Sequence, residues 1–580
     1  MDSGWCKKEE DLVAELKMQD IPFMMKAEGA DPTGVKPCDD IWKKAIASGR
    51  PIYFASGTYR ITYTSPEEKV FFFGDGSERT TLLCSYISIR ANFRAENITL
   101  KCTAAPFIMC NSKSAEISFN KCEFSWVEVP KDSNWIAYIS DCKLLRIINC
   151  KVNYGGIALY GCEDLVVRDS EFNMNWVNTD ECIHLSQNCK KGLIVGNRFY
   201  NSVHDFIDFY SNPTNFLVEG NYFSGCNDFY MMIKAIYRDE DDGYGNETNK
   251  VGAFHNLIIR NNFFSGSREK GYGMFDFSTA DYRTNKIDNN FEFYPKDVIF
   301  EGNMIDDTTL DGTSNQFSDN TDVIVFIING MSNMKFLNNH ITVNYGNKRF
   351  VQFNSSLLGQ ISENLWFDGN VISLKYGSKT VNPVQLMVNN GGCAMKNIFF
   401  RNNTVPEGSS INLNNSKSKI FDNIVFEGNL TDETYAPYGT VADQGIKLIL
   451  AGNTGTLKVR CKDMKMQLNC TGGANEAIFE HCRFVKTFCY FKGKYDRIDF
   501  INCDFANTSG GFTVRFQDCT IELIRFINCI FRQITGTHLF NTGTIKAYLA
   551  DGLVINSTGT TLWNTSGNVP VRLDHSSFYK

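Results

Sequence analysis

The sequence is poor in proline, in histidine and in long apolar runs. Its 580 residues include 13 prolines and 7 scattered histidines, and no stretch approaches 18 consecutive apolar residues. Such short apolar runs do not make a membrane-spanning helix, so we expect no membrane insertion. The few histidines show no metal-cluster spacing. We therefore expect no metal site and no organic cofactor.

An excess of basic residues is also missing, since 58 Lys and Arg face 65 Asp and Glu and the formal net charge is −7. Proteins that bind nucleic acids need a basic face to neutralise phosphates. The charge balance therefore predicts no nucleic-acid partner. The first residues, MDSGWCKKEEDLVAELKM, are charged and lack the apolar centre of a signal peptide, so we expect no cleaved export signal.

Cysteine is abundant, but its spacing is not that of a disulfide framework or a zinc site. None of the 20 cysteines forms a Cys-x-x-Cys pair. Several recur in one local context: RIINC ends at Cys150, FEHC at Cys482, FINC at Cys503 and again at Cys529. A small apolar side chain repeated in one context predicts a stack of reduced thiols in the core, in preference to disulfides or metal ligation.

A second repeat runs through the middle of the chain. Apolar runs end in Gly-Asn or Asn-Asn and are followed by another apolar pair, as in LIVGNRF, FLVEGNYF, LIIRNNFF and VIFEGNMI. The second turn residue falls at Asn197, Asn221, Asn262, Asn303, Asn339, Asn370, Asn403, Asn429 and Asn453. The same place is taken by Cys122, Cys150 and Ser170 before this series and by Cys482, Cys503 and Cys529 after it.

Repeats of variable length with a minimum in the twenties are typical of stacked β-coils. Asparagine suits left-handed turns, and stacked asparagines can form side-chain ladders. We therefore predict an all-β chain folded as a right-handed parallel β-helix. A β-propeller is the competing fold, but it requires a steadier spacing near 40–45 residues and a blade signature, which the sequence lacks.

The N-terminal region carries a resemblance to a known family. Residues 8–18 have helical periodicity, and residues 27–61 read AEGADPTGVKPCDDIWKKAIASGRPIYFASGTYRI, with a short helix expected from Asp39 to Ala47 and a strand from Ile52. The Gly-Ala-Asp-Pro-Thr-Gly turn, the Asp-led helix and the Gly-Thr-Tyr strand resemble the capping segment of the pectate-lyase-like (pectin-lyase-like) β-helix superfamily, especially its phage tailspike branch. The resemblance implies a helical neck at 1–26, a cap at 27–62, a β-helix at 63–560 with a catalytic groove near 176–300, and a tail at 561–580.

Four segments align as successive turns: ECIHLSQN, DFIDFYSN, FYMMIKAI and, after an insertion, GMFDFSTA. Because side chains alternate across a strand, Ile183 and Leu185 and their equivalents in the next segments are expected to face inward. One outward column is expected to contain His184, Asp208, Met232 and Asp276. A second is expected to contain Ser186, Tyr210, Lys234 and Ser278. Asp205, one coil from Glu181, is expected to share the outer side with Asp208.

Carboxylates crowded on neighbouring coils raise at least one pKa into the range of a general acid. We therefore predict Glu181, Asp205 and Asp208 as catalytic residues, with structural turn acids or a calcium site as the alternatives. Long insertions at 235–255 and 278–296 would form one wall of a groove. The predicted substrate-binding residues are Trp176, His184, His204, Tyr210, Tyr230, Lys234, Tyr237, Arg238 and Asp276.

Glu181, Asp205 and Asp208 resemble the Glu on one coil and Asp-x-x-Asp on the next that tailspike endoglycosidases carry. The match to polygalacturonases is poorer: Asn178-Thr179-Asp180 is followed by Glu181 in place of Gly, and no Gly-His-Gly follows. The resemblance implies an endo-glycosidase hydrolysing a bacterial surface polysaccharide, capsule or O-antigen. It also implies a homotrimer, located in the virion tail with other phage tail proteins.

Two other functions stay open from the sequence. The chain could be a polysaccharide lyase, with His184, His204 or Tyr210 as base and Lys234 stabilising a carbanion. It could also be a non-catalytic β-helix receptor-binding protein. For hydrolysis, an Asp205–Glu181 pair about 5 Å apart would suit retention. A separation near 10 Å, expected if Asp208 points three extended residues beyond Asp205, would suit inversion. An active site between subunits is a further arrangement that the sequence leaves open.

Overall fold

The structure is a computed structural model of the 580-residue chain. It describes residues 21–579 apart from 63–66, 104–105, 130–134, 177–180, 187–188, 211–212, 227–229, 236–254, 268–272, 280–295, 307–323, 344–347, 354–360, 375–383, 390–392, 433–444, 487–488, 509–511, 533–536, 557–563, 566–570 and 575–576. The contacts divide the chain into two compact units. Unit 1 contains residues up to Cys182 together with Cys189–Gly192, and unit 2 contains Ile183–Asn188 together with the chain from Leu193 onward.

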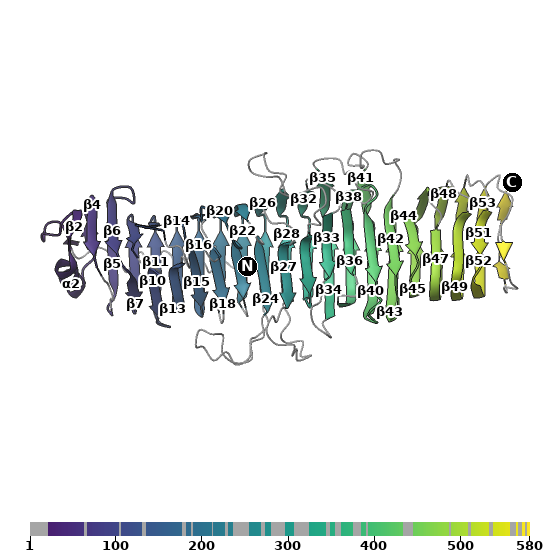
Figure 1. Cartoon of the computed structure of the whole chain (residues 1–580), viewed down its shortest axis with the longest axis horizontal. Helices are drawn as coiled ribbons and strands as arrows, with labels where there is room; N and C mark the ends of the chain where they lie inside the picture. Colours follow the sequence, from purple (N-terminus) through teal and green to yellow (C-terminus); the bar gives the residue numbers. More distant parts are fainter. Residues whose placement is uncertain are drawn as a thin grey trace. The chain divides into compact units, whose positions relative to one another are not determined.

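Unit 1 consists of strands that pair in parallel in three ladders (Figure 1). The first ladder contains β1 (Phe23–Met24), β3 (Ile52–Phe54), β5 (Val70–Gly74), β8 (Phe93–Glu96), β11 (Glu116–Asn120), β13 (Trp135–Ile148) and β16 (Cys162–Arg168). The second contains β7 (Ile87–Ile89), β10 (Ile108–Asn111), β13 and β15 (Gly156–Tyr160). The third contains β2 (Thr33–Pro37), β4 (Gly57–Ile61), β6 (Thr80–Cys84), β9 (Thr99–Cys102), β12 (Glu123–Trp126), β14 (Lys151–Asn153) and β17 (Glu171–Asn173).

Unit 2 repeats this plan with further coils. Its first ladder contains β18 (Ile183–Ser186), β21 (Ile207–Tyr210), β24 (Met231–Ala235), β27 (Gly273–Thr279), β30 (Ile324–Asn329), β33 (Lys348–Phe353), β36 (Val384–Asn389), β39 (Ser410–Asn414), β42 (Ile446–Ala451) and β44 (Lys465–Cys470). The second contains β22 (Thr214–Glu219), β25 (His255–Arg260), β28 (Lys296–Glu301), β31 (Ser332–Leu337), β34 (Ile361–Asp368), β37 (Ala394–Arg401), β40 (Ile420–Glu427), β43 (Thr456–Lys462), β45 (Ala474–Glu480), β47 (Cys489–Ile501), β49 (Phe512–Ile527), β52 (Thr544–Asp551) and β55 (Val571–Asp574).

The third ladder of unit 2 contains β20 (Arg198–Ser202), β23 (Tyr222–Cys226), β26 (Phe263–Ser267), β29 (Met304–Asp306), β32 (His340–Val343), β35 (Val371–Leu374), β38 (Thr404–Pro406) and β41 (Leu430–Asp432). The remaining strands of unit 2 are β46 (Arg483–Lys486), β48 (Asp504–Thr508), β50 (Ile530–Arg532), β51 (Thr537–Asn541), β53 (Val554–Asn556), β54 (Asn564–Thr565) and β56 (Ser577–Tyr579). Strand β19 (Gly192–Val195) contains the sequence boundary between the units. Strands stacked in parallel coils make each unit a parallel β-helix, and the predicted fold class is confirmed.

The predicted helix at Asp39–Ala47 is confirmed as α2 (Asp39–Ala47). Its buried Trp42 lies against Phe54 and Phe72, with ring centroids 6.0 and 5.8 Å apart, so the helix covers core side chains of β3 and β5. The helix predicted at residues 8–18 lies outside the described residues. No helix in the described part of the chain is long and apolar enough to cross a membrane.

The two residues of each Gly-Asn or Asn-Asn pair have different structural roles. The first residue adopts the left-handed backbone conformation, as at Asn261 and Gly302, whose φ angles are 55° and 60°. The second, such as Asn303, is buried and turned into the coil. The Asn303 Oδ1 accepts hydrogen bonds from the backbone N–H and the side-chain Nδ2 of Asn262, both at 3.0 Å. Its Nδ2 donates to the carbonyl of Ile259 at 3.0 Å and to Oδ1 of Asn339 at 3.2 Å.

The same pattern continues from Asn197 to Asn429 as one buried asparagine ladder. The prediction that Asn453 belongs to it is wrong. After Asn429 the next place is taken by Met464, whose sulfur lies 3.8 Å from the Asn429 amide nitrogen. Asn453 instead accepts a hydrogen bond from Asn415 at 3.0 Å, because it follows β42 of the first ladder, whereas Asn429 and Met464 follow β40 and β43 of the second.

We expect Asn303→Ala to lower the free energy of unfolding by about 1–3 kcal/mol, because it leaves two buried donors of Asn262 without their acceptor. Midpoints of urea unfolding measure the change. The matched control is Asn333→Gly, which removes an exposed amide and keeps a residue that tolerates the left-handed φ of 52°. An equal loss in both variants would contradict a special role for the buried ladder.

The cysteines predicted to stack as reduced core thiols do so. All 19 cysteines in the described part of the chain are free and buried. Cys482 and Cys503 occupy the coil position that Asn429 and Met464 hold earlier, as shown by successive backbone hydrogen bonds from Arg483 to Met464 and from Asp504 to Cys482. Burial raises the pKa of the Cys393 thiol to about 11. The described thiols are therefore shielded from solvent in the folded chain.

We predict that the described cysteines do not react with a thiol reagent such as Ellman's reagent at pH 8 in the native chain. Burial and a raised pKa both suppress the thiolate that reacts. All 20 thiols are expected to titrate once guanidinium unfolds the protein. Rapid labelling of several thiols in the folded protein, mapped by peptide mass spectrometry to residues such as Cys461 or Cys503, would contradict this.

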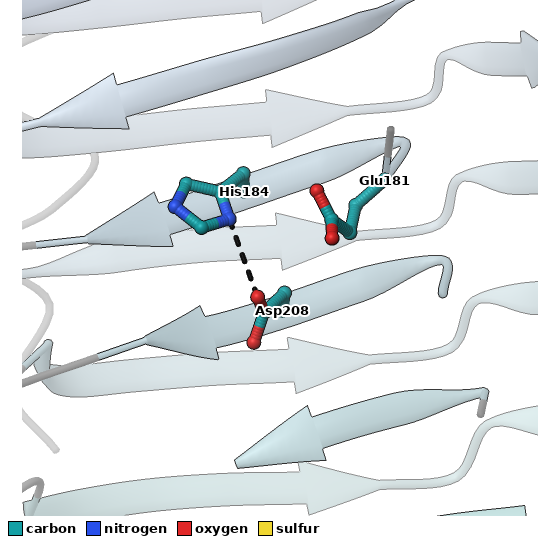
Figure 2. A group of neighbouring side chains, drawn as sticks. All are labelled: Glu181, His184 and Asp208. Atoms are coloured by element: carbon teal, nitrogen blue, oxygen red, sulfur yellow. Dashed lines mark ion pairs between the residues drawn. The ribbon is translucent and has the colours of Figure 1, made fainter. Parts of the chain in front are cut away.

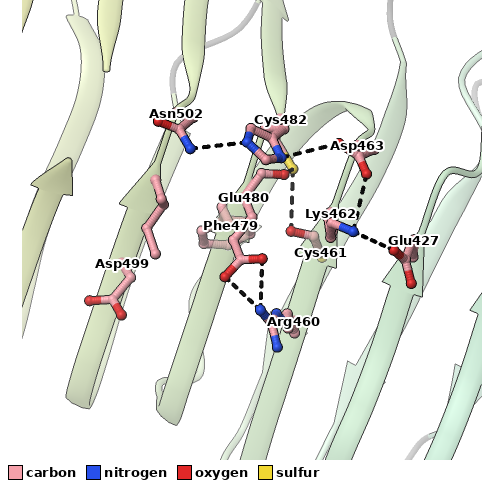
Figure 3. Close-up of polar contacts among 12 residues, drawn as sticks. Glu427, Arg460, Cys461, Lys462, Asp463, Phe479, Glu480, Cys482, Asp499 and Asn502 are labelled. Atoms are coloured by element: carbon pink, nitrogen blue, oxygen red, sulfur yellow. Dashed lines mark hydrogen bonds and ion pairs between the residues drawn. The ribbon is translucent and has the colours of Figure 1, made fainter. Parts of the chain in front are cut away.

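Charged side chains pair between neighbouring coils on the outer face of the later strands (Figure 3). Lys462 contacts Glu427 at 2.6 Å, and Arg460 contacts Glu480 at 2.7 Å. Asp499 is different because its carboxylate is fully buried and receives hydrogen bonds from Arg525 and Arg497, each at 2.7 Å. Burial raises the pKa of Asp499, but these hydrogen bonds outweigh it and the net pKa is lowered.

A carboxyl group whose pKa is lowered by folding stabilises the protein above its unfolded pKa of about 3.9, and the contribution is lost as the pH falls through the folded pKa. We therefore expect Asp499→Asn to unfold more easily at neutral pH and to lose less further stability in acid than the wild type. Urea midpoints between about pH 3 and pH 7 measure this. Asp496→Asn removes an exposed carboxylate from the same strand and should leave the pH profile unchanged. Parallel profiles for wild type and Asp499→Asn would contradict the assignment.

Candidate functional site

The coil register predicted around the carboxylates is confirmed. Strands β18 and β21 pair so that His184 lies beside Asp208. Strands β21, β24 and β27 continue the column, with Asp208 beside Met232 and Met232 beside Asp276. The alternate residues point into the coil and are fully buried. These are Ile183, Leu185, Ile207, Phe209, Met231, Ile233, Phe275 and Phe277.

Alternation therefore places His184, Asp208 and Asp276 on the side of the ladder that faces away from the coil interior. The expectation of an open outer position is nevertheless wrong for the aspartates. Asp205 and Asp208 are each 2% exposed, and Asp276 is 5% exposed. The physical reason is that alternation along a strand decides only which side a residue faces, whereas its exposure on that side depends on the packing around it.

His184 and Asp208 form a direct ion-pair contact across β18 and β21 (Figure 2). The imidazole Nδ1 lies 3.2 Å from the Asp208 Oδ2, and the two side chains are 12% and 2% exposed. Nδ1 is the ring nitrogen that faces the carboxylate. Which nitrogen carries the proton is set by the partner that each nitrogen faces.

The second oxygen of Asp208 is buried and has no hydrogen-bond partner among the described residues. A buried carboxylate oxygen without a donor is costly, on the order of 1–3 kcal/mol or more for a charged group. Such an atom is stabilised when a proton, a cation or a ligand donor reaches it. Asp208 therefore has one oxygen that faces the His184 Nδ1 and one buried oxygen to which no described residue donates.

Glu181 precedes β18 in the same segment as His184 and is half-buried. One carboxylate oxygen of Glu181, one ring nitrogen of His184 and one oxygen of Asp208 all lie within 4.8 Å of one another (Figure 2). Two carboxylates and an imidazole at this separation can share a proton, and they are also donors that a divalent cation accepts.

The other predicted site residues have different surroundings. His204 is exposed, and Trp176 is half-buried in a turn with a φ of 58°. Tyr230 is fully buried between the rings of Phe206, Phe264 and Phe275, at centroid distances of 6.3, 5.3 and 5.7 Å. The prediction that Tyr230 offers a ring to a sugar is wrong, because the residue fills the core between coils.

Tyr210 and Lys234 are neighbours in register on β21 and β24, as predicted, and their side chains lie outside the described part of the structure. The remaining predictions fall wholly on residues that are not described. These are Tyr237 and Arg238, and most of the two insertions at 235–255 and 278–296 likewise lies outside the described residues.

The sequence analysis placed His184 and Asp208 in one column and assigned His184 to substrate binding. What it did not predict is the direct contact, in which the His184 Nδ1 lies 3.2 Å from the Asp208 Oδ2. The signal was present, because the two residues share a parity and lie one coil apart in the aligned segments. It also missed a cavity in unit 1 that involves Phe71, Arg94 and Arg146.

No protein-family model matches the sequence, and no curated protein sequence matches it. Several solved structures are similar in fold. The N-terminal fragment of bacteriophage phi29 gene product 12 is 10% identical with a TM-score of 0.41, over 96% of this chain and 96% of that one. The A-module of the Azotobacter vinelandii mannuronan C-5 epimerase AlgE6 is 14% identical with a TM-score of 0.35, over 71% and 99%. The Dettilon tailspike protein (gp208) is 14% identical with a TM-score of 0.32, over 72% and 66%. At these identities and TM-scores, the likenesses assign neither a family nor an activity to the chain.

Proposed function

We propose that the chain is a tailspike-type depolymerase that cleaves internal glycosidic bonds of a bacterial surface polysaccharide, capsule or O-antigen. The observation that carries the proposal is the buried contact between His184 and Asp208, with one Asp208 oxygen free among the described residues. A parallel β-helix has no structural need for such a pair, since apolar residues at these positions would pack without the cost of burying charge.

Glycoside hydrolysis needs one protonated carboxyl to protonate the leaving oxygen and one carboxylate that attacks or activates water. Asp208 supplies one of these groups. Its partner is Glu181 or Asp205, as the sequence pattern proposes. We assign His184 a positioning role, because its imidazole Nδ1 lies 3.2 Å from one oxygen of Asp208.

The choice of partner has a stereochemical consequence. A carboxylate within 4.8 Å of Asp208, as Glu181 is, lies near the separation of about 5–5.5 Å found in retaining enzymes. If the partner is Asp205, three extended residues before Asp208, a separation of about 10 Å would lie near the inverting range of about 6.5–9.5 Å. The anomeric configuration of the first product, read by proton NMR, distinguishes the two arrangements.

Digestion of a panel of purified capsular and O-antigen polysaccharides, with products sized by mass spectrometry, tests the proposal. We expect the wild type to release oligosaccharide repeats from one polymer. Asp208→Asn and Glu181→Gln should lower the rate by about 10²–10⁴-fold and keep binding, since each removes a proton-transfer group without changing its size. Asp205→Asn tests the alternative partner in the same assay.

The matched control is Asp422→Asn, which removes a half-exposed carboxylate paired with Lys458 elsewhere in unit 2. It should cut as the wild type does. Full activity of Asp208→Asn, in a variant whose circular dichroism and unfolding midpoint match the wild type, would remove Asp208 from the mechanism.

A polysaccharide lyase is the second candidate, and the His184–Asp208 contact favours it specifically. A carboxylate on Nδ1 orients an imidazole so that Nε2 can abstract a proton next to a uronate carboxyl group. A lyase product is unsaturated and absorbs in the near ultraviolet, whereas a hydrolase product does not. In the lyase case His184→Gln should abolish activity as fully as Asp208→Asn. Binding of a polysaccharide without any cleaved product would instead indicate a receptor-binding protein.

A chelator tests whether the same three donor groups hold a cation that cleavage requires. If Glu181, His184 and Asp208 hold a divalent cation, treatment with EDTA should abolish cleavage and added metal should restore it. Activity that is insensitive to the chelator would assign the three groups to proton transfer alone. The proposal also includes a homotrimer that is located in the virion tail. Light scattering of the purified chain measures the number of copies in the oligomer.

A further inference from the structure

A cavity lined by charged and aromatic side chains lies in unit 1, on the outward face of the ladder formed by β5, β8, β11 and β13. Its volume is about 110 Å³. Phe71, Arg94, Ser118 and Arg146 line it from four successive strands. The register places Phe71 beside Arg94, Arg94 beside Ser118, and Ser118 beside Arg146. Lys69 contributes a further cation at the rim.

One arginine of the cavity is already held in place. Arg94 donates from Nε to the Glu96 carboxylate at 2.7 Å, and its guanidinium carbon lies 4.9 Å from the centre of the Phe71 ring. The lining carboxylate Glu116 is paired with Lys143, which donates to it at 2.5 Å. Both acidic side chains next to the cavity are therefore neutralised by partners of their own.

The other cations are uncompensated. Arg146 and Lys69 have no ion pair or hydrogen bond to any described residue, and the Ser118 hydroxyl between the two arginines likewise has none there. Arg146 is half-buried, so its guanidinium is partly shielded from water. A shielded, unpaired guanidinium attracts an anion more strongly than an exposed one does.

The arrangement selects a particular anion. A guanidinium binds the two oxygens of a planar carboxylate with paired hydrogen bonds. The Ser118 hydroxyl can donate to or accept from a sugar hydroxyl, and the edge of Phe71 supplies an apolar contact for a ring. The volume fits a carboxylate with part of one sugar ring, and it leaves the rest of a polymer outside.

We propose that this cavity binds a carboxylated sugar unit of an acidic polysaccharide. The polymer itself rests on the proposed function, but the binding site is formed by other residues and can be measured without cleavage. Arg146 is the main carboxylate contact, Lys69 adds attraction at the rim, and Arg94 with Phe71 forms the fixed wall.

Calorimetric titration of the full chain carrying Asp208→Asn, which protects the ligand from cleavage, tests the proposal. The probes are tetragalacturonate, neutral maltotetraose and inorganic phosphate. We expect tetragalacturonate alone to bind, and Arg146→Gln to weaken it at least tenfold. Arg146→Lys should retain part of the affinity, because an ammonium keeps the charge and loses the paired geometry. Arg90→Gln removes an exposed arginine outside the cavity, paired with Glu67, and should change nothing.

Unchanged binding in Arg146→Gln, or no binding of tetragalacturonate, would overturn the proposal. Equal binding of phosphate and tetragalacturonate would overturn it as well, since it would indicate a general anion site. A change of oligomeric state in Arg146→Gln, seen by light scattering, would assign the face to a contact between copies and would also count against it. Cleavage assays on the chain with the native Asp208 separate the two proposals. If that chain binds tetragalacturonate through Arg146 but cleaves no polysaccharide, only the proposed function fails. If it cleaves a polysaccharide but Arg146→Gln leaves binding unchanged, only the proposal for the cavity fails.

Discussion

The buried asparagine ladder of unit 2 fixes the register on which its other features depend. Each asparagine amide donates to the next coil's side chain and to a backbone carbonyl, and each side-chain oxygen accepts two hydrogen bonds from the coil before it. A shift of one residue in the register of a coil would break these hydrogen bonds. It would also turn the inward-facing side chains of that coil's strands outward. Because a buried amide left unpaired is costly, the ladder tolerates one register only.

That register places His184 beside Asp208. In a stack of coils, residues in register on neighbouring strands lie about 4.8 Å apart. Two polar residues that face the same side of such strands are therefore in contact, and no loop is needed to bring them together. The scaffold therefore holds the pair rigidly, and burial makes the contact electrostatically strong. The same geometry in unit 1 aligns Phe71, Arg94, Ser118 and Arg146 across four strands, which shows how a repeating coil can build a binding surface from single residues.

The sequence was sufficient for the fold and for the column of His184, Asp208 and Asp276, because both follow from repeat length and from alternation along a strand. The sequence did not predict how far these side chains are buried. Parity tells which side of a strand a residue faces, but the cover over that side depends on tertiary packing, so the near-complete burial of Asp205 and Asp208 and the core position of Tyr230 were not predicted. Asn453 was assigned to the wrong ladder because its local motif, AGNTG, matches the repeat, whereas it follows β42 of the first ladder and Asn429 follows β40 of the second. A second, outer series of asparagines, in which Asn256 donates to Asn215 and Asn423 to Asn397, was missed although each lies six residues before a buried ladder asparagine.

The central claim is that the chemistry takes place at Asp208. The most direct measurement is a crystal structure of the Asp208→Asn chain with an uncleaved oligosaccharide of the polysaccharide that the wild type digests. The account predicts that the glycosidic oxygen between two sugar units lies within hydrogen-bond distance of the residue 208 amide or of the Glu181 carboxylate. An oligosaccharide seated away from β18 and β21, with residue 208 still covered by His184 and in contact with no sugar, would contradict it.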